Sequence, residues 1–410
     1  MKMELMNARG TKDFLPEQKI LRQKIVDVLR EVFELYGYPP LETPLIERFE
    51  VLSAKFTGGA EILKETFSFK DQGKRDLGLR YDLTVPFSRV IAMNPRLKMP
   101  FKRYQIGRVF RDGPVKLGRA REFWQCDVDI VGAKGMLADA ETVAIASEAF
   151  KRLGINVIIK INSRKVLDAV MIEAGVSKDK IETAILTLDK LEKIGEKGVL
   201  AEFKDKGIDG KKVLKIVKEG KLKNNEGLEE LKQIEGYLKG FGVKNYKIDY
   251  TLARGLSYYT GTVFEAVCDE LDSSLAGGGR YDKMIGGFIG KGDYPAVGIS
   301  FGLEPIYEVL KEKEGKKSVV DLYVIPIGTL DESLKIISDL RSKGIKCDID
   351  FNGRNVSKNL KYANKMEIPY VLIIGEDELK TGKFSLKNMK SGKEEKLVVS
   401  KIVKRVDCIH

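Results

Sequence analysis

Apolar residues recur at helical spacing over residues 17–36, where they include Ile20, Leu21, Ile25, Val28, Leu29, Val32 and Phe33. This period predicts an amphipathic helix that ends before Gly37 and the Pro39-Pro40 pair. Residues 41–132 are richer in β-formers and turn residues, and they alternate in places such as 66–69 and 77–81, which predicts strands. Residues 133–155 return to a helical pattern.

The chain changes character at about residue 162. Residues from about 162 to 243 are helix-forming and rich in Lys and Glu with almost no aromatics, which predicts an inserted helical module. Strand-like sequence follows at 246–267, then a glycine-dense segment at 276–292 and a predicted helix near 305–314. The run Lys311 to Lys317 is all charge and glycine, which is typical of a linker between domains.

Beyond this run, apolar and amphipathic segments alternate. Apolar residues 322–327 precede amphipathic residues 330–343, and strand-like 346–350 precedes helical 356–366 and apolar 370–374. Strands separated by helices predict a small α/β domain with a largely parallel sheet. We therefore expect residues 1–317 to form one domain with the helical insertion, and residues 318–410 to form a second.

The composition narrows the possible functions of the 410-residue chain. A formal charge of +12 fits either a lysine-rich solvated surface or nucleic-acid binding, and charge alone does not decide between them. No apolar run approaches the ~20 residues of a membrane span, and residues 1–16 lack a secretory apolar region. A cytoplasmic protein that is neither membrane-bound nor secreted is expected.

The single histidine is His410, the last residue, and the four cysteines are far apart without a CxxC pair. This excludes the Ser-His-Asp triads, His-based zinc or iron sites and disulfide frameworks that need more of these residues. Any catalysis must use carboxylates, arginines, lysines, tyrosines or the substrate itself.

Residues 102–131 are the most informative stretch, because two predicted strands, 102–111 and 122–131, flank a turn-rich loop. Period-two alternation places on one face of the second strand Phe123, Gln125, Asp127 and Asp129. A solvated sheet edge would explain this polar face. The loop, however, also carries arginines at 111, 119 and 121, and arginines beside carboxylates suit a zwitterion and phosphates.

Three smaller clusters have both a structural and a functional interpretation. Asp82 and Thr84, in the segment from Arg80 to Thr84, share a face. Tyr258 and Tyr259 follow a strand, where adjacent tyrosines often serve only half-buried packing. The glycines 277–279 form either a phosphate cradle or a flexible turn, and they match neither GxGxxG nor GxxxxGK[ST], so no Rossmann or P-loop site is expected.

Taken in order, these segments resemble the histidyl-tRNA synthetase family of class II enzymes. The matching segments are Arg9 to Pro16, Tyr36 to Pro44 (motif 1), Phe110-Arg111 with Gly118 to Phe123 (motif 2), Leu252 to Glu265 (the histidine signature), Ala276 to Glu304 (motif 3 and its approach), and Gly344 to Lys346 with Ile373 to Glu378 in the anticodon-binding domain. The resemblance implies an antiparallel catalytic domain with a helical insertion, a C-terminal α/β anticodon-binding domain, and a homodimer.

The resemblance also implies a mechanism that needs no enzyme nucleophile. The carboxylate of L-histidine attacks the α-phosphate of ATP, with Mg²⁺, and the tRNA(His) 3′ ribose then takes the aminoacyl group; binding and charge stabilisation suffice for this chemistry. Arg111 and Arg254 would hold the α-phosphate, and the ATP-binding set would add Arg119, Phe123 and Arg280, with Phe123 stacked on adenine.

For histidine, the resemblance implies that Asp82 and Thr84 anchor the α-amino group and that Gln125 lies near the carboxylate. Asp129, Tyr259 and Tyr281 would bind the imidazole, which offers one donor and one acceptor, and Tyr258 would close the pocket. Such a site can reject apolar analogues by leaving its own polar groups unpaired.

Two positions depart from the family pattern. Ser257 stands where the signature commonly has Asp, and Pro305 stands where motif 3 normally supplies an arginine to ATP, with Arg280 as a candidate substitute. A non-catalytic paralogue resembling the regulatory subunit of ATP phosphoribosyltransferase is the main alternative, although that family typically lacks the signature arginine and the anticodon domain. A general RNA-binding protein would leave the cluster of Asp82, Gln125, Asp129 and Tyr259 unexplained.

Overall fold

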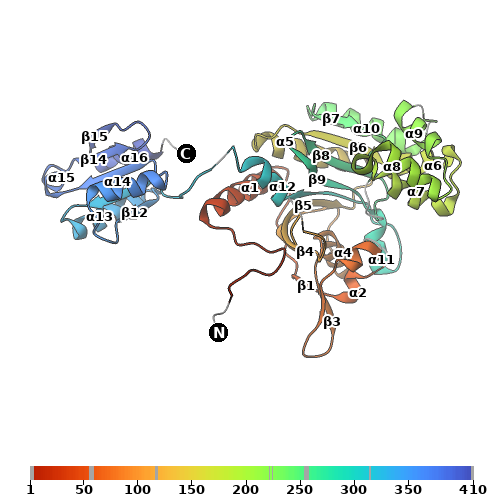
Figure 1. Cartoon of the computed structure of the whole chain (residues 1–410), viewed down its shortest axis with the longest axis horizontal. Helices are drawn as coiled ribbons and strands as arrows, with labels where there is room; N and C mark the ends of the chain where they lie inside the picture. The colour runs from red at the N-terminus through yellow and green to blue at the C-terminus, as the bar shows by residue number, and fades with distance from the viewer. Residues whose placement is uncertain are drawn as a thin grey trace. The chain divides into compact units, whose positions relative to one another are not determined.

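The computed structural model of the chain describes residues 4–54, 60–115, 119–220, 222–223, 225–253, 258–313 and 315–407. The chain divides into two compact units, one formed by residues 1–13 and 24–310, the other by residues 14–23 and 311–410. Figure 1 shows their elements, and each unit is described by itself. No described helix is long and apolar enough to cross a membrane.

A seven-stranded sheet forms the centre of the first unit. Its order is β4 (Phe101–Phe110), β5 (Glu122–Val131), β10 (Ala296–Gly302), β9 (Leu271–Arg280), β8 (Thr262–Cys268), β6 (Ile158–Ser163) and β7 (Tyr246–Ile248). Neighbouring strands are antiparallel except β6 and β7, which run parallel. The two strands predicted around residues 102–131 are therefore confirmed as neighbours.

Helices α1 (Pro16–Leu35), α5 (Leu137–Arg152) and α12 (Leu303–Leu310) supply apolar residues to one face of this sheet. The ring of Phe301 on β10 lies 5.6 Å from that of Phe33 on α1 and 5.5 Å from that of Phe150 on α5. The alternate side chains of β5, Cys126, Val128 and Ile130, are buried as well. Burial of one face against helices leaves the polar face of β5 to line a site.

A smaller layer lies on the polar side of β5. It contains the three-stranded sheet of β1 (Ile46–Arg48), β3 (Asp76–Leu79) and β2 (Ser68–Lys70), and the helices α2 (Phe49–Leu52), α3 (Ala60–Lys64), α4 (Thr84–Met93) and α11 (Asp282–Ile289). Figure 1 shows α2, α4 and α11 close together, and a shared core joins α4 to α11 through Phe87, Met284 and Ile285. Asp82 comes just before α4, and Thr84 is the first residue of this helix.

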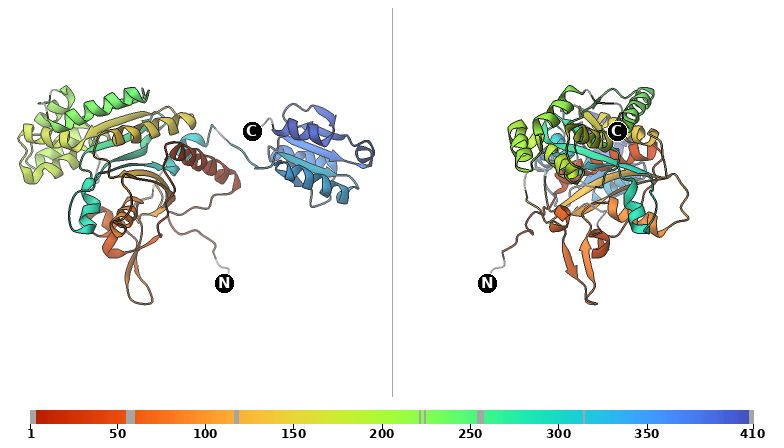
Figure 2. Two further views of the ribbon diagram at one scale, coloured as in Figure 1. Left: turned by 180° about the vertical axis from the view of Figure 1, so that it is seen from behind. Right: turned by 90° about the vertical axis from the view of Figure 1, so that its right-hand side faces the viewer.

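The predicted helical insertion is observed between β6 and β7. It contains α6 (Arg164–Ala174), the 3₁₀ turn Lys178–Lys180, α7 (Ile181–Leu188), α8 (Leu191–Asp205), α9 (Gly210–Glu219) and α10 (Glu226–Gly240). Figure 2 shows these helices gathered at one end of the seven-stranded sheet when the unit is seen from behind. Their apolar residues, such as Val199, Phe203 and Val213, are buried, so the insertion has a core of its own.

The glycines of residues 277–279 lie within β9, so the segment is a strand and not a loop or turn. A Cβ on Gly278 would lie 2.0 Å from the carbonyl oxygen of Gly298 on the neighbouring strand. A Cβ on Gly279 would lie 2.3 Å from the carbonyl oxygen of Thr262. Glycine is therefore required by close backbone approach, which local sequence patterns do not reveal.

The second unit is a five-stranded sheet in the order β12 (Cys347–Ile349), β11 (Leu322–Pro326), β13 (Tyr370–Ile374), β14 (Phe384–Asn388) and β15 (Glu394–Leu397). The first three strands are parallel and the last two are antiparallel, so the sheet is mixed and the predicted parallel part covers only one side. On one face of the sheet, a hydrophobic core includes residues of α13 (Leu330–Ser342) and α16 (Val399–Asp407). On the other face, the core includes residues of α14 (Val356–Lys365). The short helix α15 (Glu376–Thr381) follows β13.

Candidate active site

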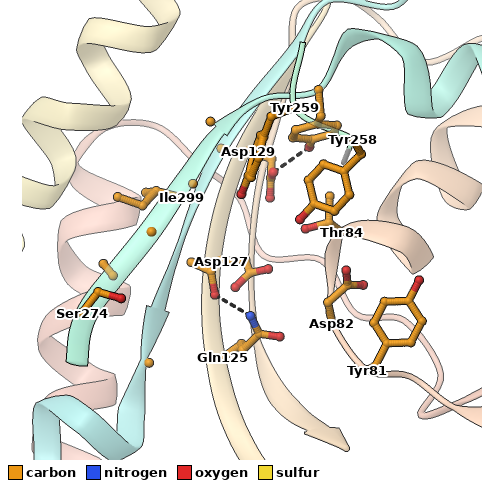
Figure 3. A pocket seen from close by; sticks show the side chains of 18 of the residues that line it. Tyr81, Asp82, Thr84, Gln125, Asp127, Asp129, Tyr258, Tyr259, Ser274 and Ile299 are labelled. Atoms are coloured by element: carbon orange, nitrogen blue, oxygen red, sulfur yellow. Dashed lines mark hydrogen bonds between the residues drawn. The ribbon is translucent and has the colours of Figure 1, made fainter. Parts of the chain in front are cut away.

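A cavity of ≈ 320 Å³ lies against the polar face of β5. Residues from distant parts of the chain line it: Ile62 of α3, the segment after β3 with the start of α4, Arg111 after β4, the polar face of β5, the tyrosines before β8, and the glycine-containing strands β9 and β10. Figure 3 shows Asp82 and Thr84 on one side of the cavity, with Gln125, Asp127 and Asp129 along the strand opposite. Most of the predicted site residues are thus brought together.

The predicted residues that line the cavity are Asp82, Thr84, Arg111, Phe123, Gln125, Asp129, Tyr258, Tyr259 and Tyr281. The alternative of a solvated sheet edge is wrong for β5, because Asp127 and Asp129 are only 2% and 3% exposed. The polar face of this strand therefore has a buried, ligand-sized space before it.

Asp129 is held by two partners. Its Oδ2 lies 2.8 Å from Nη2 of Arg103, which is fully buried on β4, and its Oδ1 accepts a hydrogen bond of 2.6 Å from the Tyr281 hydroxyl. Burial raises the pKa of Asp129, and Arg103 and Tyr281 oppose that rise by stabilising the carboxylate. Arg103 stands opposite Asp129 in the β4–β5 register, so the sheet itself sets this pair.

The tyrosines form an aromatic wall at one end of the cavity. The rings of Tyr258 and Tyr259 are 4.7 Å apart, and Tyr258 meets Tyr281 edge to face at 6.2 Å. Burial, followed by the nearby carboxylate of Asp129, raises the pKa of Tyr281 well above its usual value, so its hydroxyl stays protonated as a donor. The space before Asp129 is therefore bounded by flat apolar surfaces and fixed polar atoms, which suits a small heteroaromatic ring.

Asp82 provides a second buried carboxylate across the cavity. Its Oδ1 accepts a hydrogen bond of 3.0 Å from the backbone N–H of Val85 in the first turn of α4. Burial raises its pKa to about 6, although this hydrogen bond and Arg111 act in the opposite direction. A cationic group bound beside Asp82 would stabilise the ionised carboxylate and so offset the cost of burying its charge.

Arg111 and Phe123 mark another part of the cavity. The guanidinium of Arg111 lies 5.2 Å from the centre of the Phe123 ring, and its Nε donates to the backbone carbonyl of Tyr81 at 3.1 Å. Among the described lining residues, Arg111 is the only cation. A guanidinium beside an aromatic face suits a nucleotide, with the phosphate near the arginine and the base on the ring.

Two of the described residues that were predicted for the site, Arg280 and Arg119, do not line the cavity. Arg280 is buried outside it, where its guanidinium pairs with Asp139 and donates to Asp282 at 3.3 Å; this engagement corrects the expectation that Arg280 is available to ATP phosphates. Arg119 is exposed and does not line the cavity. Arg254, like Ser257 and the motif 2 residue Gly118, lies outside the described residues.

Sequence reasoning did not single out Arg103, Asp127 and Ser300 as site residues. Asp127 shares the polar face of β5 with Gln125 and Asp129, and this alternation was a usable signal. Ser300 lies on β10 opposite Asp127, and Gln125 Nε2 donates to its hydroxyl at 2.7 Å. No local pattern joins residues so far apart, because only the strand register pairs them.

The described residues contain no group of three or more His, Cys, Asp or Glu side chains placed to hold a metal ion. The cavity offers carboxylates that can pair with a cationic group of a ligand, a slot between tyrosine rings, and Arg111 beside the ring of Phe123. This arrangement can bind a zwitterion with a heteroaromatic side chain next to a nucleotide phosphate.

Comparison with known proteins agrees with this chemistry. The sequence profile described as "Histidyl-tRNA synthetase" matches residues 10–306, and the profile described as "Anticodon binding domain" matches residues 321–409. Histidine--tRNA ligase 1 of Bacillus cereus is 46% identical over 98% of this chain and 99% of its own length. Histidine--tRNA ligase of Clostridium tetani is 38% identical over 96% of each chain.

Solved structures are similar as well. The histidyl-tRNA synthetase from Nostoc sp. PCC 7120 matches with a TM-score of 0.88 and 31% identity over 100% of both chains. A Bacillus halodurans C protein titled as an ATP phosphoribosyltransferase regulatory subunit/histidyl-tRNA synthetase matches with a TM-score of 0.75 over 91% of this chain and 99% of that one; at 23% identity this likeness concerns the fold alone. Because a family profile covers most of the chain and relatives align along nearly its full length, the chain belongs to the histidyl-tRNA synthetase family.

Proposed function

We infer that this protein ligates L-histidine to tRNA(His) in two ATP-dependent steps. The observation that carries the inference is the meeting, in one cavity, of Asp82, Thr84, Arg111, Gln125, Asp129 and the tyrosines from distant segments. A histidine carboxylate oxygen attacks the α-phosphorus of ATP, the bond to the bridging oxygen breaks, and pyrophosphate leaves. The tRNA 3′ ribose hydroxyl then attacks the acyl carbon and releases AMP.

Histidine is bound through its three functional groups. Asp82 and Thr84 hold the α-ammonium, Gln125 lies near the carboxylate, and Asp129, Tyr259 and Tyr281 bind the imidazole while Tyr258 closes the slot. The contacts of 2.8 and 2.6 Å that fix the carboxylate of Asp129 support this assignment, because a fixed acceptor positions one imidazole N–H without reorganisation.

ATP is bound through Arg111 at its α-phosphate and Phe123 at adenine, with Arg254 facing the same phosphate and Arg119 contributing from the loop. Pro305, on α12, cannot provide the motif 3 cation, and Arg280 is engaged with Asp139 and Asp282. Arg111 and Arg254 therefore carry more of the phosphate charge than they would beside a third arginine.

Mg²⁺ is proposed to arrive with ATP. This ion usually keeps several waters and binds through substrate phosphates with one or two carboxylates, so it needs no cage of protein ligands. It would neutralise phosphate charge when bound, and the protein's own contribution remains the positioning of the histidine carboxylate by Gln125 and of the α-phosphate by Arg111.

The two parts of the chain take different roles in this proposal. Residues 1–317, with the insertion at about 162–243, form the catalytic domain, and residues 318–410 bind the anticodon. The division into compact units and the separate profile matches support this assignment. We also propose a cytoplasmic homodimer, on the resemblance of residues 36–44 to the dimer-forming motif 1.

Histidine-dependent exchange of pyrophosphate into ATP tests the proposal directly. Purified protein should support exchange with histidine and with none of the other amino acids. Arg254→Ala should lower the exchange rate by about 10²-fold or more, as loss of a charge stabiliser usually does. An unchanged rate would remove Arg254 from its assigned role.

The same assay separates the enzyme from the regulatory paralogue, the main alternative at the level of sequence. Binding of histidine without exchange would favour the paralogue, and Pro305→Arg would then be the first variant to examine. Exchange with histidine would rule the paralogue out and show that Pro305 is tolerated.

A further inference from the structure

Asp127 is a buried carboxylate in the cavity to which neither the family resemblance nor the proposed mechanism gives a role. It is only 2% exposed, it lines the cavity, and its Oδ1 has no hydrogen-bond partner among the described residues. A buried carboxylate oxygen without a donor is costly, because it has lost water and gained nothing in exchange. Such an oxygen in a ligand-sized space indicates that the ligand supplies the donor.

The charges around Asp127 show which kind of donor is missing. The described cavity lining contains three carboxylates, Asp82, Asp127 and Asp129, but only one cation, Arg111. Arg103 is already paired with Asp129 at 2.8 Å. Among the described lining residues, carboxylates therefore outnumber cations on the side where Asp127 and Asp82 face the cavity (Figure 3).

The surroundings of Asp127 orient it without satisfying it. Ser300 on β10 provides its side-chain hydrogen bond, while Arg103, Arg80, Asp129 and Asp82 act on it through their charges. Burial raises its pKa to about 7, and Arg103 only partly offsets this. The carboxylate is held in place, yet its Oδ1 has no hydrogen-bond donor in the part of the chain that the structure describes.

The remaining acceptors on this side complete the pattern. Gln125, two residues earlier on the same face of β5, also has an unpartnered oxygen, Oε1. Alternate residues of a strand lie about 7 Å apart, and an ammonium offers three N–H donors. A primary ammonium placed among Asp82, Asp127 and Gln125 can donate to all three, whereas an imidazole N–H can donate to only one.

We propose that Asp127 accepts a hydrogen bond from the α-ammonium of the amino-acid substrate and, with Asp82, forms a two-carboxylate clamp that selects ligands with a free α-amino group. The proposal rests on histidine being the substrate, as argued above. It makes Asp127 a substrate-binding residue with a role distinct from that of Asp129, which meets the side chain.

The test compares three ligands by isothermal titration calorimetry. L-histidine has the ammonium and the carboxylate, histidinol keeps only the ammonium, and 3-(imidazol-4-yl)propionate keeps only the carboxylate. Asp127→Asn should lower the affinity for histidine and for histidinol by on the order of 10²-fold, the usual effect of breaking a buried charge pair. The affinity for 3-(imidazol-4-yl)propionate should change by less than about 3-fold. Glu230→Gln, which alters a carboxylate paired with Lys165 in the insertion, is the matched control and should change none of them.

The ratio of ligand affinities is measured within one variant, so it does not depend on the fraction of folded protein. If Asp127→Asn does not fold, Asp127→Ser removes the same charge with a smaller side chain. An equal loss of affinity for all three ligands, or no loss for any of them, would overturn the proposal while leaving histidine as the substrate. Failure of the wild-type protein to bind histidine would overturn both this proposal and the proposed function.

Discussion

At the scale of single residues, the site depends on buried polar atoms that are fixed before the substrate arrives. The hydroxyl of Tyr281 donates to Asp129, which in turn pairs with the fully buried Arg103. Removal of the hydroxyl leaves the Asp129–Arg103 ion pair in place but frees the carboxylate to move. The network thus allows one contact to be removed without exposing an unpaired charge.

Tyr281→Phe should therefore raise the KM for histidine in the exchange assay by about 10-fold, the cost of one hydrogen bond to a charged group. The KM for ATP should change by less than about 2-fold, because Tyr281 lies at the imidazole end of the cavity. Tyr237→Phe, at an exposed tyrosine of α10, is the control. Equal increases for both substrates would show that Tyr281 supports the fold and not the imidazole.

Asp82 should make the stability of the unliganded protein depend on pH. Burial raises its pKa from 3.8 to about 6, so the folded state favours the protonated carboxyl more than the unfolded state does. Above about pH 6 the carboxyl is ionised in both states, and the folded state bears the full cost of burying that charge. The contribution of Asp82 to the free energy of unfolding therefore falls as the pH rises from about 4 to 6.

Asp82→Asn should remove this cost and stabilise the unliganded protein by up to about 3 kcal/mol at pH 7, with little gain at pH 4. Urea unfolding, followed by the fluorescence of the single tryptophan, Trp124, measures the free energy of unfolding of the first unit. The same variant should bind histidine more weakly. A gain of the same size at both pH values would contradict the assigned ionisation.

At the scale of elements, the register of β5 with its neighbours builds the site. On β10, Gly298 stands opposite Asp129, Ser300 opposite Asp127 and Gly302 opposite Gln125. A Cβ on Gly298 would lie 2.0 Å from Oδ1 of Asp129, so only glycine leaves room for that carboxylate. A shift by one residue would move all three polar side chains to the apolar face.

Gly278→Ala should destabilise the first unit by about 2–3 kcal/mol, because the new Cβ would overlap the backbone of β10 at Gly298 and Ile299. Gly236→Ala is the matched control, since nothing lies within 4 Å of its Cβ position in α10 and alanine favours a helix by about 0.5–1 kcal/mol. Urea unfolding should give opposite signs for the two variants. Destabilisation by Gly236→Ala, or none by Gly278→Ala, would contradict the close strand approach.

At the scale of the whole molecule, activation and tRNA selection are assigned to separate parts of the chain. Every cavity residue lies between Ile62 and Gly302, within the first unit, whereas the anticodon-binding profile matches residues 321–409. Histidine activation should thus not need the C-terminal residues. Removal of the C-terminal residues should instead weaken tRNA binding, because the tRNA would lose its contacts to them.

Deletion of residues 318–410 should raise the KM for tRNA by at least about 10-fold in the aminoacylation assay. Pyrophosphate exchange with histidine should stay within about 3-fold of the full chain. The intact chain, assayed for both reactions in the same buffer, is the reference. Loss of exchange would mean that the C-terminal residues support the catalytic fold.

The sequence by itself determined the features that depend on near neighbours in the chain. The alternation along residues 122–131 placed Gln125, Asp127 and Asp129 on one face, and the change to helix-forming, Lys- and Glu-rich sequence located the insertion. The order of motifs indicated the family, which the profile match over residues 10–306 confirmed. These features were readable because strand and helix periods follow from backbone geometry over a few residues.

Only the tertiary structure decided which side chains meet. β5 pairs with β10, about 170 residues further along the chain, and this pairing joins Asp127 to Ser300 and explains Gly298. The glycines at 278 and 279 of β9 are explained by its close approach to β10 and β8. Arg280 stands in a motif-like position, yet its guanidinium is taken by Asp139 from another element. The physical reason is that burial, ion pairing and close backbone approach depend on elements distant in sequence, whose register no local pattern specifies.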